Sequence, residues 1–233
     1  MTTWIFGNSD GIGLALTRNL LAEGREVVSV SRSPLPEPIA AQVRHHEVLD
    51  VTDPAYGARL TALLDALGTP SVCVWCIGVG DALDLGALAA ERRTFAVNLM
   101  AAVETVEHVL PRMLEAGEGH VVTLSSQADR LISAEAPSYS ASKAALSSYM
   151  EGLALAVRDK GVRITNVRLG FVDTKMAKSP VKPFMMTPEA AAALIQRSLT
   201  RRPIRVTRPL RMAAVLTALQ WFVAAQIGWL SLF

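Results

Sequence analysis

Three polar side chains, Ser126, Tyr139 and Lys143, have the types and the spacing needed for proton transfer. Tyr139 and Lys143 stand four residues apart at the start of a predicted long helix, so they share one helix face with Cβ atoms about 5–6 Å apart. Ser126 precedes Tyr139 by 13 residues and follows a predicted strand. A free tyrosine has a pKa of about 10, and a nearby ammonium group is expected to lower it toward the range of acid/base catalysis. Each residue alone also has an ordinary structural explanation, so the set gains meaning only beside a hydride carrier.

A glycine-rich turn that could hold such a carrier follows the first predicted strand. It reads Gly7-Asn8-Ser9-Asp10-Gly11-Ile12-Gly13 and opens a predicted helix. The spacing is G-x-x-x-G-x-G rather than the G-x-G-x-x-G of the standard dinucleotide fingerprint. Glycines let the backbone approach a pyrophosphate, and a helix N-terminus favours anions. We predict a dinucleotide site contacted by Gly7, Ser9, Asp10, Gly11, Ile12 and Gly13, although such turns also form only to pack tightly.

The end of the second predicted strand indicates which dinucleotide is bound. A carboxylate there would hold the ribose 2′-OH of NAD, whereas an arginine accommodates the 2′-phosphate of NADP. The chain has Ser31-Arg32-Ser33 and no carboxylate at this point. Arg32 can make a bidentate, charge-assisted contact with a phosphate, although Asp10 would oppose the phosphate and Arg32 could simply be solvated. We expect NADP, with NAD as the alternative.

Short apolar segments that favour strands alternate with longer helical stretches along the chain. The strands are predicted at Trp4–Phe6, Val27–Val30, Glu47–Leu49, Ser71–Ile77, His120–Leu124 and Arg163–Arg168, and the helices at Ile12–Glu23, Pro54–Leu67, Glu91–Ala116, with Pro111 bending or ending it, and Tyr139–Lys160. This order is typical of βαβ units in a mostly parallel sheet covered on both faces. The predicted fold is a single doubly wound, Rossmann-like α/β domain over residues 1–190, with an extension over 191–233 that ends in an apolar helical tail. Ser126 then lies at the carboxyl ends of the strands, where such sheets bind ligands.

In this order and spacing the motifs resemble those of the short-chain dehydrogenase/reductase family over residues 3–175. The resemblance is carried by the glycine turn, Asp50-Val51-Thr52-Asp53, Asn98, Ser125-Ser126, Tyr139-x-x-x-Lys143 and Gly170-Phe171-Val172-Asp173-Thr174. It implies that Asp50 and Val51 bracket the adenine, and that Val172 and Thr174 contact the nicotinamide carboxamide. It also implies that Asn98 helps to hold a proton-relay water, that Ser126 binds the substrate oxygen, and that Gly78, Asn98, Tyr139 and Lys143 belong to the cofactor site.

Four positions depart from the family pattern. Phe6 stands where Thr is usual, Val74-Trp75-Cys76-Ile77-Gly78 where N-N-A-G is common, Leu169 where Pro precedes the glycine, and Asp10 where NADP-preferring relatives often carry a basic residue. None is a proton-transfer group, so the departures bear on cofactor affinity more than on activity.

The expected function is an NADP-dependent oxidoreductase that interconverts a ketone or aldehyde and an alcohol, with Asn98, Ser126, Tyr139 and Lys143 as its catalytic residues. The alternative is a non-catalytic nucleotide-binding or scaffold protein with the same fold. By the resemblance, residues 175–187 form a substrate lid, and the methionines 176, 185 and 186 in it suit a hydrophobic substrate. The resemblance also implies a homo-oligomer.

Composition excludes several other classes of protein. A chain that is 51% hydrophobic and 19% charged, with 23 basic and 21 acidic side chains, is neither disordered nor collagen-like. Two cysteines make no disulfide framework and the N-terminus shows no signal-peptide pattern, so we expect a cytoplasmic protein. Cys73 and Cys76 are predicted to be small buried hydrophobes, and His45-His46 a solvated edge, so neither metal nor nucleic acid is expected as a partner.

The C-terminal segment has an unusual charge pattern. No Asp or Glu follows Glu189, six arginines lie between positions 197 and 211, and the 22 residues from Met212 to Phe233 carry no charge. As a helix this run would be about 33 Å long, against a hydrocarbon core of about 30 Å. It could cross a membrane, lie on its surface, or be buried against its own domain or a partner subunit. We expect residues 201–233 to form an interaction surface that is dispensable for hydride transfer.

Overall fold

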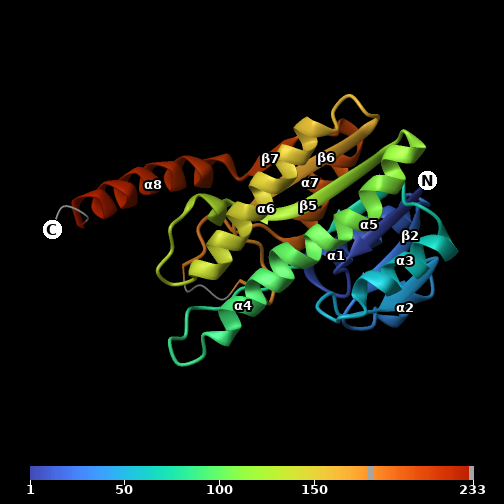
Figure 1. Ribbon diagram of the computed structural model, residues 1–233, viewed down its shortest axis with the longest axis horizontal. Helices are drawn as coiled ribbons and strands as arrows, with labels where there is room; N and C mark the ends of the chain where they lie inside the picture. Colours follow the sequence, from blue (N-terminus) through green and yellow to red (C-terminus); the bar gives the residue numbers. More distant parts are fainter. Residues whose placement is uncertain (178–180, 231–233) are drawn as a thin grey trace.

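The computed structural model describes residues 1–177 and 181–230 and has a seven-stranded, entirely parallel sheet with helices on both faces (Figure 1). The strand order is β3-β2-β1-β4-β5-β6-β7. The chain thus forms the doubly wound, Rossmann-like α/β domain that the sequence predicts.

All six predicted strands are present, with ends that differ by a few residues. They are β1 (Thr2–Phe6), β2 (Glu26–Ser31), β3 (His45–Val48), β4 (Val72–Trp75), β5 (Gly119–Ser126) and β6 (Val162–Leu169), and β7 (Arg205–Arg208) is added to them.

The predicted helices are also present, but the one predicted over Glu91–Ala116 is divided into two helices with a π-helical turn between them. The helices are α1 (Gly11–Ala22), α2 (Glu37–Ala40), α3 (Tyr56–Leu67), α4 (Ala89–Phe95), α5 (Ala101–Ala116), α6 (Pro137–Ala156), α7 (Pro188–Arg201) and α8 (Leu210–Leu230). A π-helical turn, Ala96–Met100, joins α4 to α5, and a short 3-10 helix, Gln127–Arg130, follows β5. Pro111 lies inside α5 and does not end it.

Alternating side chains of the strands build two hydrophobic cores, one on each face of the sheet. Trp4 and Phe6 point into the core shared with α3, α5 and α6, while Ile5 between them points into the core shared with α1 and α7. Two departures from the family pattern meet in the first core, since the rings of Phe6 and Trp75 lie 5.6 Å apart. These departures therefore contribute apolar packing beneath the site.

The first part of the predicted extension over 191–233 packs on the sheet. Helix α7 begins at Pro188 and buries Ala191, Ala192 and Ile195 in the second core. After it, β7 pairs with β6 over Asn166–Leu169. Residues 191–208 are thus part of the Rossmann-like unit. The sequence hides this because the buried face of α7 includes two alanines and a serine, and β7 is only four residues long with an arginine at each end.

Helix α8 forms the predicted apolar tail and projects from the body of the protein (Figure 1). Only Met212 and Leu216 of its described residues are buried. Burial against its own domain, one of the three expected arrangements, therefore holds only for the first two turns.

Candidate active site

Ser126, Tyr139 and Lys143 come together at the carboxyl edge of the sheet. Ser126 is the last residue of β5, and Tyr139 and Lys143 lie in the first turns of α6. A hydrogen bond links the side chains of Ser126 and Tyr139. The Lys143 side chain is buried and its Nζ donates to the carbonyl oxygen of Leu124 at 3.0 Å. The spacing in the sequence thus corresponds to one compact group of a hydroxyl, a phenol and an ammonium.

In this structure the pKa of Tyr139 is raised rather than lowered. Burial raises the pKa of Tyr139, the charge of Asp129 raises it further, and the hydrogen bond with Ser126 lowers it only in part. The lowering expected from Lys143 together with the oxidised nicotinamide stays a prediction for the complex with cofactor. Burial also lowers the pKa of Lys143 to about 8. At neutral pH the site thus presents a protonated phenol beside a largely protonated lysine.

Asn98 lies in the π-helical turn and clamps the chain that follows β4. Its Oδ1 accepts from the backbone N–H of Val79 at 2.8 Å, and its Nδ2 donates to the Val79 carbonyl at 2.8 Å and to Ser142 Oγ at 3.0 Å. The amide therefore joins this chain segment to α6, one residue before Lys143. π-Helical turns of this kind often occur at functional sites.

Two glycines after β4 allow the side chains of the site to approach the backbone. A Cβ at Gly78 would lie 3.3 Å from Lys143 Nζ and 3.6 Å from Asn98 Oδ1. A Cβ at Gly80 would lie 2.7 Å from the ring of Tyr139. Gly78 was expected in the cofactor site, whereas Gly80 was missed. The sequence signal for it was the second glycine of Gly78-Val79-Gly80.

The glycine turn has the geometry of a nucleotide cradle. Gly7 and Gly11 have φ values of +82° and +54°, which favour glycine. A Cβ at Gly13 would lie 2.2 Å from the carbonyl oxygen of Gly7, so only glycine lets α1 pack this closely. Buried Asn8, which sequence analysis did not select, donates to Thr17 and accepts from Ser29 and so ties the turn to α1 and β2. The turn can hold a dinucleotide, because its glycines let a pyrophosphate approach the backbone and the N-terminus of α1 favours an anion.

Asp10 caps the N-terminus of α1 and carries a partner charge. Its Oδ1 accepts from the N–H of Gly11 at 2.8 Å, and its Oδ2 lies 2.7 Å from Lys175 Nζ. The hydrogen bond with Lys175 is the main cause of a lowered pKa of Asp10. Both side chains are exposed, so this pair contributes little to stability. It nevertheless offsets the negative charge that sequence analysis placed against a phosphate.

The residues predicted around the adenosine lie on the loops that follow β2 and β3. Arg32 is exposed, one residue beyond β2. Asp50 Oδ1 accepts from the N–H and the hydroxyl of Thr52, and these bonds, together with the charge of Arg32, lower the pKa of Asp50. Val51 is buried beside them. Arg32 and Asp50 thus act on each other electrostatically, at the edge where an adenosine ribose is expected.

The segment after β6 approaches the glycine turn from the opposite side. A Cβ at Gly11 would lie 3.2 Å from Thr174 Cγ2. Val172 is buried and pairs with Met186, so the chain returns on itself beyond the predicted nicotinamide contacts. Part of the predicted lid at 175–187, residues 178–180, lies outside the described residues.

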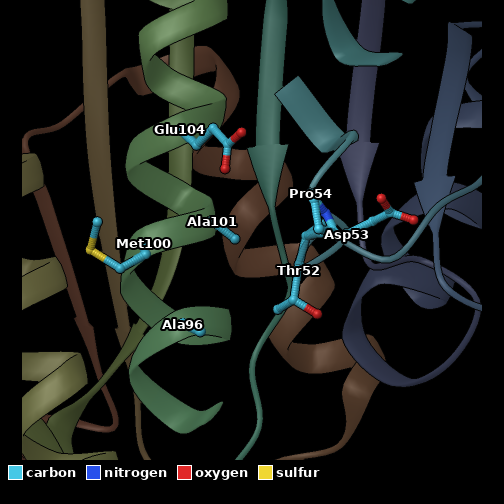
Figure 2. A pocket seen from close by; sticks show the side chains of 8 residues that line it. Thr52, Asp53, Pro54, Ala96, Met100, Ala101 and Glu104 are labelled. Atoms are coloured by element: carbon cyan, nitrogen blue, oxygen red, sulfur yellow. The ribbon is translucent and has the colours of Figure 1, made fainter. Parts of the chain in front are cut away.

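A cleft of about 250 Å³ lies between the loop after β3 and the start of α5. Figure 2 shows Thr52 and Pro54 of the loop across the cleft from this helix, with the Asp53 carboxylate pointing away from the helix. Its lining residues are Val51, Thr52, Asp53, Pro54, Ala96, Met100, Ala101 and Glu104. Val51 links the cleft to the predicted adenine site, but none of the predicted catalytic residues lines it.

A buried ion pair behind the catalytic group was not predicted. Arg168 of β6 makes a bidentate contact with Asp129, and the side chains of the two are 4% and 3% exposed. Ser147 Oγ lies 2.7 Å from Asp129 Oδ2 and 2.7 Å from Ser125 Oγ, and Ser125 Oγ lies 3.1 Å from the Lys143 carbonyl oxygen. Since each hydroxyl has one proton, two of these three contacts are hydrogen bonds at a time. This network fixes α6 to the helical turn that follows Ser126. The contacts join residues 39 positions apart, which no local motif indicates.

The cysteine pair and the histidine pair that sequence analysis singled out have structural roles. Cys73 and Cys76 are both free, and burial raises the pKa of each thiol to about 12, as expected for small core residues. His45 and His46 lie within β3 rather than before it, and His46 Nδ1 is 2.9 Å from Ser29 Oγ. Over residues 1–177 and 181–230, no group of three or more His, Cys, Asp and Glu side chains could hold a metal ion.

Comparisons with known proteins agree with this fold. A model of the short chain dehydrogenase family matches residues 2–183. A relative from Myxococcus xanthus, named as an oxidoreductase, is 34% identical over 226 residues, which cover 91% of this chain and 88% of the relative. A solved short-chain dehydrogenase from Streptomyces avermitilis has a TM-score of 0.82 at 26% identity and covers 97% of this chain and 95% of its own. BdcA, solved in complex with NADPH, has a TM-score of 0.74 at 23% identity, covers 88% and 91%, and shows the shared fold.

The family match extends over most of the chain, so this protein belongs to the short-chain dehydrogenase family. With relatives named as oxidoreductases, it is an NAD(P)-dependent dehydrogenase or reductase.

The buried ion pair yields a stability prediction. Arg168→Met leaves the Asp129 carboxylate buried without its partner, which should lower the free energy of unfolding by about 3–5 kcal/mol. The double variant Asp129→Leu/Arg168→Met removes both charges and should lose less. Urea unfolding followed by circular dichroism measures both changes.

The matched control is the more exposed pair of Arg112 and Asp65. Arg112→Met should cost less than about 1 kcal/mol. Equal losses for Arg168→Met and Arg112→Met would contradict the structural role given to the buried pair.

Proposed function

We propose that the protein is an NADP-dependent reductase that interconverts a ketone or aldehyde and an alcohol, with Tyr139 as the acid/base group. The observation that carries the proposal is the convergence of Ser126, Tyr139 and Lys143 beside the glycine turn, at the carboxyl edge of the parallel sheet. A protein that only bound nucleotides would have no physical need for this group.

The cofactor would be held by the residues that border the turn. Gly7, Gly11 and Gly13 open the backbone to the pyrophosphate, and Val172 and Thr174 approach from the loop after β6. Gly78 borders Lys143 and Asn98, which leaves room at the sugar and nicotinamide end. When bound, the nicotinamide supplies or accepts the hydride, and the protein supplies alignment and electrostatics.

Proton transfer in this proposal belongs to Tyr139. Because its pKa is raised, the phenol is protonated at neutral pH and can donate its proton to a carbonyl oxygen held by the Ser126 hydroxyl. Lys143, whose pKa is about 8, is mostly protonated at pH 7 and supplies positive charge beside the phenolate that forms. Asn98 holds the Val79 backbone and Ser142 in register with this group and, by the family resemblance, helps to hold a relay water. The reverse sequence serves alcohol oxidation.

The preference for NADP rests on charge. Arg32 is exposed and can turn toward a 2′-phosphate, and Lys175 offsets the charge of Asp10. The complex of the structural neighbour BdcA with NADPH supports the same cofactor class.

The substrate class follows from the exposed apolar side chains near the site. Ile132, Met176, Phe184 and Met185 are between 38% and 67% exposed on the loops after β5 and β6. Such a surface favours an apolar carbonyl compound over a charged one. We also propose a cytoplasmic location of the catalytic domain and assembly into a homo-oligomer, as is common in the family.

The catalytic role of Tyr139 predicts a specific loss. Tyr139→Phe removes the transferable proton and keeps the ring against Gly80, so kcat should fall by about 10²–10⁴-fold while NADPH affinity changes by less than about twofold. The measurement is NADPH oxidation, followed by its absorbance, over a panel of apolar ketones and aldehydes, with cofactor affinity from fluorescence titration.

Tyr149 lies on the same helix outside the catalytic group and gives the matched control. Tyr149→Phe should retain wild-type turnover. Near-normal rates in Tyr139→Phe would remove Tyr139 from the mechanism, and a wild type that binds NADPH but reduces nothing would favour the scaffold alternative.

If Arg32 binds the 2′-phosphate, its loss should weaken the binding of NADPH but not that of NADH. Arg32→Ala removes a charge-assisted contact worth about 1.5–3 kcal/mol, so the Kd for NADPH should rise by about 10–100-fold and that for NADH should stay within about twofold. Arg18→Ala, on the exposed side of α1, should change neither. Binding titrations decide this, and equal effects of Arg32→Ala on both cofactors, or a wild type that prefers NADH, would refute the NADP assignment.

A further inference from the structure

Helix α8 exposes large apolar side chains that soluble domains normally bury. Trp221 is 76% exposed, Phe222 68%, Val215 58% and Leu219 43%. Over Leu210–Trp229 the mean hydropathy reaches 1.4 and only 11% of the segment is buried. A core helix of the same composition would be mostly buried, so α8 is not packed as one.

The exposed apolar side chains surround the helix axis. At about 100° per residue, Val215, Leu219 and Phe222 lie on one side, within about 60° of one another, while Trp221 and the 42% exposed Ile227 lie about 120° from Val215 in opposite directions. A helix that rests on a membrane surface, or on one face of a partner subunit, has an apolar stripe and a polar face. A helix that is apolar on all sides matches a surrounding apolar medium instead.

The length of α8 and its lack of charge beyond Arg211 also favour an apolar medium. The root of α8, up to Thr217, is docked on the domain, since Met212 and Leu216 are buried and Arg130 donates to Thr217. Residues 218–230 extend about 20 Å beyond this root, so they reach into a hydrocarbon core of about 30 Å without crossing it. From Met212 onward the chain has no charged residue, with Thr217, Gln220 and Gln226 as the polar side chains of the helix.

Basic side chains collect at the end of α8 that joins the body. Arg208 and Arg211 are exposed there, and no acidic residue follows Glu189 in the sequence. Arg201 and Arg202 precede β7, and Arg202 lies near His120 at the amino end of β5, so they stand at the opposite edge of the sheet. Arg205 pairs with Glu151. Two arginines directly before an apolar helix complement the anionic headgroups of a bilayer surface.

The root of α8 is attached to the catalytic domain beside the site. Arg130 Nη1 donates to Thr217 Oγ1 at 2.8 Å, and Gln127 Nε2 donates to the carbonyl of Pro209 at 3.1 Å. Both donors belong to the helical turn that follows Ser126. Because β7 runs parallel to β5, α8 leaves from the same edge of the sheet at which the site lies.

We propose that α8 inserts into the hydrocarbon core of a lipid bilayer and anchors the enzyme, with Arg208 and Arg211 at the headgroups. The catalytic domain then stands at the membrane surface with the carboxyl edge of its sheet toward the lipid. The anchor does not depend on the chemistry proposed for Tyr139, and NADPH binding therefore serves as a control for folding.

The test uses the full-length protein, diluted from detergent into phosphatidylcholine vesicles with or without phosphatidylglycerol. The wild type should sediment with both kinds of vesicle and stay bound in about 1 M NaCl, where electrostatic attraction is screened. Brominated acyl chains should quench the exposed Trp221 and Trp229, whereas Trp4 and Trp75 are 0% and 2% exposed in the core and report no contact with lipid.

The variant Leu219→Lys/Phe222→Lys places two charges on exposed positions of α8. Its vesicle-bound fraction should fall at least tenfold with NADPH affinity unchanged, while the apolar control Leu219→Met/Phe222→Leu should bind as the wild type does. Three results would overturn the proposal: no sedimentation of the wild type with either vesicle, release of the protein by salt without quenching, or a lysine variant whose only change is a smaller oligomer in light scattering. The last result would assign α8 to a second copy of the chain.

Discussion

The parallel direction of all seven strands is the constraint on which the rest of the structure depends. Because every strand ends at the same edge, residues from distant parts of the chain meet there: the glycine turn after β1, Gly78 and Gly80 after β4, Ser126 at the end of β5 and Thr174 after β6. The alternating side chains of each strand fill two cores, which hold this edge rigid. Helix α8 leaves from the same edge, so catalysis and the proposed anchor share one end of the protein.

Burial of charge at this edge sets its chemistry. Lys143 lies in the interior, where loss of water lowers its pKa to about 8 and raises the pKa of the neighbouring phenol. The Asp129–Arg168 pair is buried nearby and reaches the Lys143 backbone through two serines. A buried pair of this kind adds little net stability but is costly to break. Its role here is to hold α6, which carries Tyr139 and Lys143, against β5.

Much of the fold and the centre of the site could be predicted from sequence, because both depend on local patterns. The alternation of strands and helices, the glycine turn and the i, i+4 pair of Tyr139 and Lys143 need only neighbours along the chain. The Asp129–Arg168 pair and the approach of Gly80 to Tyr139 depend on tertiary contacts, and no local pattern encodes them. The burial that raises the pKa of Tyr139 is likewise a tertiary property, whereas the charge of Lys143 was visible in the sequence. The places of α7 and β7 likewise depend on packing against α1 and β6, which no local pattern shows.

The central claim is that this edge directs a hydride between a nicotinamide dinucleotide and a carbonyl carbon. The most direct measurement uses NADPH carrying deuterium at one or the other face of nicotinamide C4, with an apolar ketone as substrate and mass spectrometry of the alcohol product. A fixed cofactor held by the glycine turn predicts deuterium on the carbinol carbon from one labelled form only, with the label of the other form kept in the oxidised cofactor. Deuterium transferred from both forms, or NADPH oxidation without a labelled alcohol, would contradict the account.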